Sequence, residues 1–359
     1  MTAASARLSV PSAYDRVAAE LARLAPAFGL TERRELLLAA FDAIGRESLA
    51  WPLGDRRWAQ SRINADGTPF QLATALGPAT PALQFLGEAG PPAAPPPVRQ
   101  AASRACWIKL AALFGAQTEL CDARPLLAAL APENDWRLAA EPAGAFWIGA
   151  AFAPARPPQL RIYCNGAWGP ERDRWLRLDR FAAELGVAAE WRAARAALPR
   201  HLRPLGAAVT IARGAAPAGR IYVSGYGGRL ADYERLARAV SGERFAAALH
   251  RYAEHLLGED CERPTPSAVC SLGLGAGNPM GLKVELCSHC LFPTDAAARA
   301  ALESCFGAAG VDSSPYTSLL QTLADGDRLD GEVRYHSYAG IGTGGERHHY
   351  SVYLQPKLF

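Results

Sequence analysis

Hydrophobic and polar residues follow a helical period near the start of the chain and the period of β-strands further along. Segments 14–29 and 31–47 place apolar residues on one helical face, and Thr31 is suited to cap the second helix. From residue 58 onwards, short runs alternate between apolar and polar positions, which is typical of strands with one buried face. The chain therefore begins with helices and continues with strands and helices in turn.

The predicted strands come in pairs with short connections, as antiparallel hairpins require. The pairs are 58–76 with 82–89, 144–152 with 159–167, 206–214 with 219–227, 267–275 with 281–289, and 333–343 with 348–356. Helical sequence follows every pair except the last, over 98–115, 172–198, 230–257 and 294–323. A unit of two strands and two helices thus recurs about every sixty residues, which indicates a repeated supersecondary structure.

Ten strands in one antiparallel sheet predict a closed barrel, because a sheet of that size curls and closure removes its edges. Helices outside would cover the apolar face, so the interior can be polar and wide enough for a ligand chamber. We expect an α+β fold of repeated ααββ units, in which residues 1–359 form a single domain. Helices would occupy 1–50 and the barrel 58–356. The alternative is two α+β domains divided at the Pro-rich loop 91–97.

Composition narrows the partners and the cellular location. With 38 basic and 35 acidic residues, the net charge of +3 gives no concentrated basic surface for nucleic acid. The sequence has no apolar run long enough to cross a membrane and no pattern of a signal peptide. Eight cysteines in such a chain favour free thiols over a disulfide framework. We therefore expect a cytoplasmic protein that binds neither nucleic acid nor membranes.

The triplet Arg-Ile-Tyr occurs in the second strand of two successive pairs, at 161–163 and at 220–222. Residues two apart on a strand share a face, so each triplet places an arginine beside a tyrosine. The equivalent strands further on add Lys283, Glu285 and Tyr353. If these strands are neighbours in a barrel wall, cations and phenols converge on one chamber. The alternative is that these residues are solvated strand residues and ordinary β-formers.

Converging Arg and Lys side chains are suited to a diphosphate, because Arg binds its oxygens in a bidentate manner and Lys supplies a compact charge. Tyrosine rings serve a different need. A carbocation released from an allylic diphosphate is attracted to aromatic faces and is destroyed by water. The combination of the two residue types indicates allylic diphosphate chemistry.

With these features, residues 58–356 resemble the aromatic prenyltransferases with the αββα barrel, especially the dimethylallyltryptophan synthase group and its bacterial indole prenyltransferases. The resemblance implies transfer of a dimethylallyl or longer allylic group from its diphosphate, through an allyl cation, to an indole or tryptophan-like acceptor. It also implies residue roles. The diphosphate-binding residues would be Arg161, Arg220 and Lys283, and the tyrosines that shield the cation would be Tyr163, Tyr222 and Tyr353.

Two glutamines depart from the family pattern. The family usually has Pro-x-Glu in its first strand, where the glutamate takes a proton from the acceptor, but TPFQL places Gln71 there. Gln71 can hydrogen-bond an N–H group but cannot remove a proton. In the second strand, QFLGE keeps Glu88 and has Gln84 in place of a diphosphate-binding arginine. Glu88, Glu285, water or the diphosphate itself remain candidates for the proton.

Three other patterns have weaker interpretations. The sequence CSHC at 287–290 is either part of a zinc site or a pair of ordinary thiols. His348 and His349 either line the chamber mouth or lie at the surface. The glycine-rich stretches 271–281 and 340–346 lack the ending of a phosphate-binding loop and are expected to be hairpin connections.

The sequence has no Asp-Asp-x-x-Asp clamp for a diphosphate-bound metal. We therefore expect no required cofactor, with Mg²⁺ compatible with activity but not essential. Two other functions fit the same barrel. One is prenylation of a side chain in a peptide, as in cyanobactin prenyltransferases. The other is a barrel that binds a hydrophobic ligand without catalysis.

Overall fold

Ten antiparallel strands close into a barrel in the computed structural model, as the sequence predicts. The structure describes residues 11–59, 61–77, 81–131, 146–258, 264–265, 267–275, 280–344 and 347–359. Every strand pairs with its neighbours in the chain, and β1 pairs with β10 to close the barrel. The strands are β1 (Phe70–Leu76), β2 (Ala82–Gly87), β3 (Phe146–Ala153), β4 (Arg156–Asn165), β5 (Arg203–Ala212), β6 (Ala215–Gly225), β7 (Ala268–Leu274), β8 (Gly281–Cys287), β9 (His336–Gly344) and β10 (Arg347–Leu354).

The Pro-rich loop does not divide the sheet. β2 precedes this loop and β3 follows it, yet the two strands pair over residues 83–87 and 148–152. The end of the loop instead starts a helix at Pro96, because the first turn of a helix tolerates the missing N–H of proline. The strands on either side of the loop therefore belong to one barrel.

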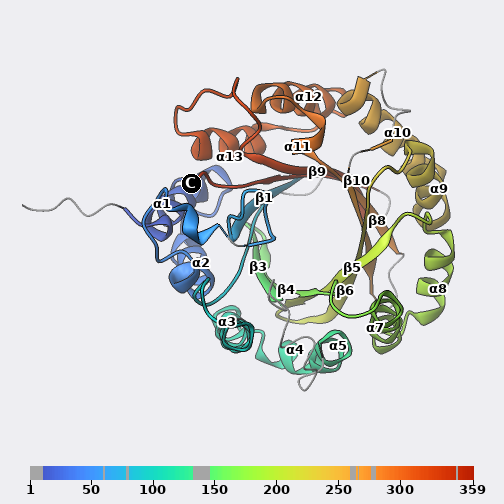
Figure 1. The fold of residues 1–359 in the computed structure, drawn as a ribbon, viewed down its shortest axis with the longest axis horizontal. Coiled ribbons are helices and arrows are strands. Elements are labelled where there is room, and N and C mark those ends of the chain that lie inside the picture. The colour runs from blue at the N-terminus through green and yellow to red at the C-terminus, as the bar shows by residue number, and fades with distance from the viewer. Residues whose placement is uncertain are drawn as a thin grey trace, which may run out of the picture.

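Helices surround the barrel in a ring (Figure 1). They are α1 (Ala13–Ala27), α2 (Arg34–Ser48), α3 (Pro96–Phe114), α4 (Gln117–Asp122), α5 (Arg124–Leu130), α7 (Glu171–Glu184), α8 (Ala188–Ala197), α9 (Leu230–Ser241), α10 (Glu243–Leu257), α11 (Ser288–Leu291), α12 (Asp295–Ala308) and α13 (Ser314–Ala324). No helix in the described ranges is both long and apolar enough to cross a membrane. The expected cap of the second helix is wrong, because Thr31 starts a 3-10 turn over 31–33 and α2 begins only after it.

The hydrophobic core lies between the helices and the outer face of the barrel. Along β4, Leu160 and Ile162 are fully buried in this layer, whereas Arg161 and Tyr163 line cavities inside the barrel. The same alternation on β1 places Phe70 and Leu72 in the core and Gln71 inside. Burying the outer face against helices thus leaves the inner face available for polar side chains.

The glycine-rich stretch 340–346 is not only a turn, which corrects the expectation from the sequence. Residues 340–344 belong to β9, and residues 345–346 lie outside the described ranges. A Cβ on Gly340 would lie 2.7 Å from Cγ of Glu285, and one on Gly342 would lie 3.0 Å from Cγ of Lys283. Gly340 therefore makes room for Glu285, and Gly342 makes room for Lys283 and for His349, whose Cε1 would lie 2.7 Å from the added Cβ. In the other stretch, 271–274 belong to β7, whereas 276–279 are not described.

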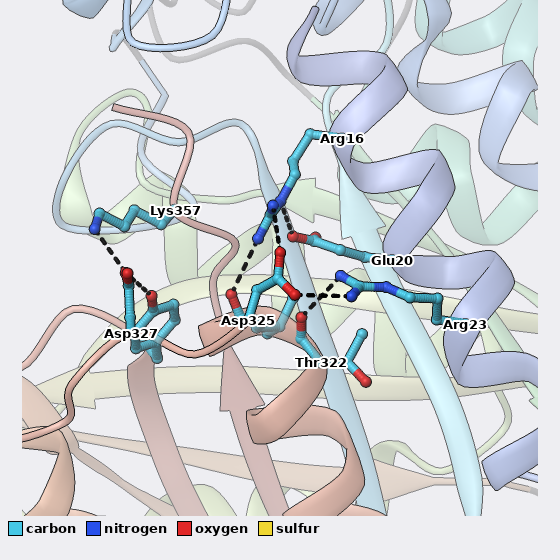
Figure 2. Close-up of polar contacts among 9 residues, drawn as sticks. Arg16, Glu20, Arg23, Thr322, Asp325, Asp327 and Lys357 are labelled. Atoms are coloured by element: carbon cyan, nitrogen blue, oxygen red, sulfur yellow. Dashed lines mark hydrogen bonds and ion pairs between the residues drawn. The ribbon is translucent and has the colours of Figure 1, made fainter. Parts of the chain in front are cut away.

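The ring of helices closes where α1 meets α13, and ion pairs hold this seam (Figure 2). Asp325 caps α13 in the left-handed conformation, with φ at 45°, and its carboxylate accepts hydrogen bonds from Arg16 at 3.0 Å and Arg23 at 2.9 Å. Arg23 also donates to the Thr322 carbonyl at 3.2 Å. Arginines thus lie at the negative end of the α13 dipole, where cations are favourable.

Glu20 lies beneath this seam and is fully buried, with Arg16 Nε 2.5 Å from its Oε1. Burial raises the pKa of Glu20 from 4.5 to about 7, although Arg16 opposes the shift. A carboxyl whose pKa is raised by folding stabilises the fold below its unfolded pKa. That contribution is lost as the pH rises through about 7.

We expect Glu20→Gln to remove this pH dependence, because glutamine resembles the protonated carboxyl at every pH. Between pH 4.5 and 8, the wild type should lose up to roughly 3 kcal/mol of unfolding free energy relative to the variant. Urea denaturation at several pH values measures this difference. Glu32→Gln, at an exposed position, is the matched control. If the unfolding free energies of wild type and Glu20→Gln changed with pH in the same way, the expectation would be contradicted.

Candidate active site

The barrel encloses two adjoining cavities of different chemistry. The cationic cavity, of about 180 Å³, is lined by Arg161, Arg220, Lys283 and His349 together with hydroxyl-bearing residues. The aromatic cavity, of about 260 Å³, has mostly aromatic, aliphatic and amide side chains. Residues common to both linings are Gln84, Arg161, Tyr163, Tyr222 and Tyr353. Tyrosines therefore form the boundary between the two cavities.

The order of residues along alternate strands explains this layering. In a closed antiparallel barrel every second strand runs in the same direction, so a step of two residues moves the same way along the barrel axis on each. Each step leads from the cationic cavity to the tyrosine boundary or beyond it. The steps are Arg161 to Tyr163 on β4, Arg220 to Tyr222 on β6, Lys283 to Glu285 on β8, and Ser351 to Tyr353 on β10.

Neutral side chains position the two arginines of the cationic cavity. Arg161 donates to Oε1 of Gln84 at 2.5 Å and to Oε1 of Gln159 at 3.2 Å. Arg220 donates to the Ser271 hydroxyl at 3.0 Å. These partners fix the guanidinium groups without neutralising them. The arginines therefore keep their full charge for an anionic ligand.

Lys283 has a charged partner and lies at the junction of the two cavities. Its Nζ is 2.6 Å from Oε1 of Glu285 and donates to the Tyr353 hydroxyl at 2.5 Å. Burial lowers the pKa of Lys283 to about 8, although Glu285 opposes this shift. Burial and the neighbouring cations also lower the pKa of His349 to about 3, so this imidazole is neutral.

The boundary tyrosines present phenol rings to both cavities. The rings of Tyr163 and Tyr222 lie 5.9 Å apart between centroids, at an interplanar angle of 44°. Burial raises the pKa values of Tyr222 and Tyr353 well above 10. The Lys283 ammonium lies 4.6 Å from the centroid of the Tyr353 ring. These rings can stabilise a cation between the cavities through their aromatic faces.

A buried amide network supports one wall of the aromatic cavity. Gln71 lines this cavity, and its Nε2 donates to Oδ1 of Asn64 at 3.0 Å. Asn64 Nδ2 in turn donates to the backbone carbonyls of Thr68 and Phe70 at 3.0 and 2.8 Å. The Ser337 hydroxyl also donates to Asn64 Oδ1 at 2.9 Å. Gln71 is therefore held by one end of its amide.

The predicted diphosphate-binding and shielding residues all line one or both cavities, and so do Gln71 and Glu285. Glu88 does not line either cavity. It accepts a hydrogen bond from Ser61 at 2.7 Å and lies 3.5 Å from Arg99 of α3. Burial raises its pKa. The structure thus separates Glu88 from the other candidates, because it follows β2 at the end of the barrel.

The two neighbouring histidines have different environments. His349 lines the cationic cavity, whereas the His348 ring packs against Phe245 of α10 at 5.6 Å between centroids. Alternation along β10 is the reason, because adjacent residues of a strand face opposite sides.

The thiol motif is the remaining candidate from the sequence. Cys287 and Cys290 are free, and Cys261 lies outside the described residues. Among the residues described, no group of three or more His, Cys, Asp or Glu side chains could hold a metal ion. The described part of the motif therefore offers two thiols and no metal centre.

Several residues that line the cavities do not stand out in the sequence. Trp147 and Tyr338 lie on the first strands of their hairpins, β3 and β9, and face the aromatic cavity. The alternation FWIG around Trp147 contains this signal, because Phe146 and Ile148 are both buried in the core. Asn64 carries no comparable signal, since it precedes β1 in an irregular segment.

Comparison with known proteins shows that this fold is shared with prenyltransferases. The 6-dimethylallyltryptophan synthase from Micromonospora olivasterospora, solved in complex with DMASPP and Trp, has a TM-score of 0.81 and 22% identity, over 96% of this chain and 97% of that chain. The prenyltransferase PriB in its apo form has a TM-score of 0.82 and 20% identity, over 97% of each chain. AnaPT from Neosartorya fischeri has a TM-score of 0.74 and 14% identity, over 96% and 95%. No protein-family model matches the sequence, and no curated protein is similar to it at sequence level.

We expect Arg161→Ala and Arg220→Ala each to weaken the binding of inorganic diphosphate. A charge-assisted hydrogen bond contributes roughly 1.5–3 kcal/mol, so the Kd should rise about 10- to 100-fold. Isothermal titration calorimetry measures this change. Arg328→Ala, which removes an exposed arginine paired with Asp330, is the control. Unchanged Kd values for both cavity variants would show that the anion binds elsewhere.

The pKa of Lys283 predicts a second property of the anion site. Above about pH 8 the free amine is neutral, so binding a diphosphate must also take up a proton. The Kd of inorganic diphosphate should then rise by up to about tenfold per pH unit above pH 8. Lys283→Arg keeps its charge and should lack this rise. Calorimetry on both proteins from pH 7 to 10 therefore separates the effect of Lys283 deprotonation on the Kd from the effect of ligand ionisation. Identical pH profiles would contradict the expectation.

Proposed function

We propose that this protein is an aromatic prenyltransferase that transfers an allylic group from its diphosphate to an indole or tryptophan-like acceptor. The observation that carries the proposal is the tyrosine boundary between the cationic and aromatic cavities. It provides separate places for an anion, a carbocation and an electron-rich ring along one axis. The neighbouring structures include a complex with both DMASPP and Trp, which supports the same assignment here.

In this proposal the diphosphate binds to Arg161, Arg220 and Lys283 in the cationic cavity. The C–O bond between the allylic carbon and the diphosphate breaks, and negative charge develops on the leaving group. Fixed cations stabilise that charge without reorganising during the reaction. Gln84 contributes by orienting Arg161, and its amide N–H groups are donors that can also reach the anion.

The allyl cation then lies against Tyr163, Tyr222 and Tyr353. Burial keeps Tyr222 and Tyr353 protonated by raising their pKa values, and the three rings attract the cation and shield it from water. The acceptor occupies the aromatic cavity, so attack by its ring occurs across the tyrosine boundary. Gln71 accepts a hydrogen bond from the ring N–H and orients the acceptor.

The dimensions and charge of the site support this function over its two alternatives. A cavity of about 260 Å³ is below the usual range for drug-sized ligands, which suits one indole ring system rather than a cyclic peptide. A barrel that only bound a hydrophobic ligand would not need a buried cation such as Lys283, because burying charge is unfavourable. The free thiols of the described cysteines support a cytoplasmic location.

We expect the chain to form prenylated product from dimethylallyl diphosphate and tryptophan, and to keep most of this activity in EDTA. Three protein cations can neutralise much of the diphosphate charge, so Mg²⁺ should not be essential. Mass spectrometry of indoles, phenols and peptides incubated with C5, C10 and C15 diphosphates tests the donor and acceptor classes together. Activity that EDTA abolishes and Mg²⁺ restores would show that a metal shares the diphosphate.

A further inference from the structure

We propose that Glu285 accepts the proton that the aromatic ring loses after alkylation, while Asn64 restricts Gln71 to a neutral orienting role. The inference rests on the proposed function and assigns a step that the function leaves open. It also departs from the family pattern, in which a glutamate at position 71 takes the proton. Two independent parts of the structure support it.

The first part is the orientation of the Asn64 amide. Asn64 Nδ2 donates to two backbone carbonyls, so the opposite atom, Oδ1, must face Gln71. Because Oδ1 can only accept, Gln71 must present its Nε2 to it, and Gln71 Oε1 is left to face the cavity. Position 71 therefore offers an acceptor that cannot remove a proton. Turning either amide over would place two oxygens, or two NH₂ groups, against each other.

The fixed orientation of the Asn64 amide, which we call the Asn64 lock, also explains why a carboxylate at position 71 would not act as a base. One of its oxygens would lie against Asn64 Oδ1, where only a hydrogen-bond donor fits. Burial among acceptors favours the protonated acid, which donates to Asn64 and presents a carbonyl oxygen to the cavity. A protonated glutamate at position 71 would therefore make the same hydrogen bonds as the glutamine that it replaced.

The second part is the position of Glu285. It is the only acidic side chain among the described residues that line the two cavities. Gly340 faces it on β9 and leaves the space that its side chain occupies. Glu285 belongs to the aromatic cavity, while Lys283, two residues earlier, belongs to the cationic cavity. The pair thus connects the place where a proton is released with the place where the diphosphate leaves.

The proton transfer balances without an added reagent. The ring carbon bonds to the allylic carbon, and the diphosphate departs with the C–O electron pair. The C–H bond at the alkylated carbon then breaks, its electrons restore the aromatic ring, and the proton passes to the Glu285 carboxylate. Lys283 gives a proton to the diphosphate and recovers one from Glu285, 2.6 Å away. The net products are the prenylated ring and a protonated diphosphate.

The test uses Glu285→Gln with tryptophan deuterated at the alkylated ring carbon. Loss of a general base should lower kcat by about 10²–10⁴-fold. Deprotonation should also become the slow step, so a primary deuterium isotope effect should appear in the variant and exceed that of the wild type. A merely structural loss of activity would leave the isotope effect unchanged, which would overturn the proposal.

A donor labelled with ¹⁸O at its bridging oxygen follows ionisation separately. In Glu285→Gln, the C–O bond should still break and reform, so the label should exchange into non-bridging positions faster than product forms. If the wild type neither exchanges the label nor transfers a prenyl group to any acceptor, the proposed function itself fails. If both proteins transfer the group at equal rates, only the assignment of Glu285 fails.

Two further variants test the rival residues. The Asn64 lock predicts that Gln71→Glu, added to Glu285→Gln, restores no more than a few-fold of the lost kcat. Recovery to within tenfold of the wild type would overturn the role of Asn64. Glu88→Gln should show no new isotope effect, because Glu88 lies outside both cavities. An isotope effect in Glu88→Gln and none in Glu285→Gln would assign removal of the proton to Glu88 and overturn the proposal.

Discussion

Closure of an antiparallel barrel is the constraint on which the site depends. Because alternate strands run in the same direction, the same short motif on each of them produces one layer of identical chemistry around the axis. Arg-Ile-Tyr on β4 and on β6 therefore gives two cations at one level and two phenols at the next. The intervening isoleucines face outward and join the hydrophobic core beneath the helices. One repeated triplet thus builds both the chamber and its support.

The fold and the polar layers could be predicted from the sequence because both arise from local alternation. The hairpins, the closed barrel and the inward positions of Arg161 and Tyr222 all follow from a period of two. Other features depend on contacts between distant segments. Asn64 accepts a hydrogen bond from Ser337 only when β9 and β10 close against β1. The reason for a glycine at position 340 becomes clear only when Glu285 lies opposite it on β8. The roles of the site residues stay predictions.

The two glutamines that depart from the family pattern have partners that explain them. Gln84 does not supply charge, but its carbonyl oxygen accepts a hydrogen bond from Arg161 and so fixes the position of that cation. Gln71 is matched to Asn64, whose amide is itself fixed by the backbone. A position in a buried polar network therefore cannot be interpreted apart from its partners, because each amide determines which end of its neighbour is available.

The pairing of β1 with β10 has a consequence for how the chain folds. Leu72 pairs with Leu354, so the contact that closes the barrel joins its first and last strands, which lie far apart in the sequence. Hairpins can form early from local contacts, whereas this last pairing must bring together two distant segments of the chain and is intrinsically slow. Until it forms, β1 and β10 are open edges that can pair with other molecules. The ion pairs between α1 and α13 oppose separation of these helices, and α13 packs against β1, so they help to keep the barrel closed once this pairing has formed.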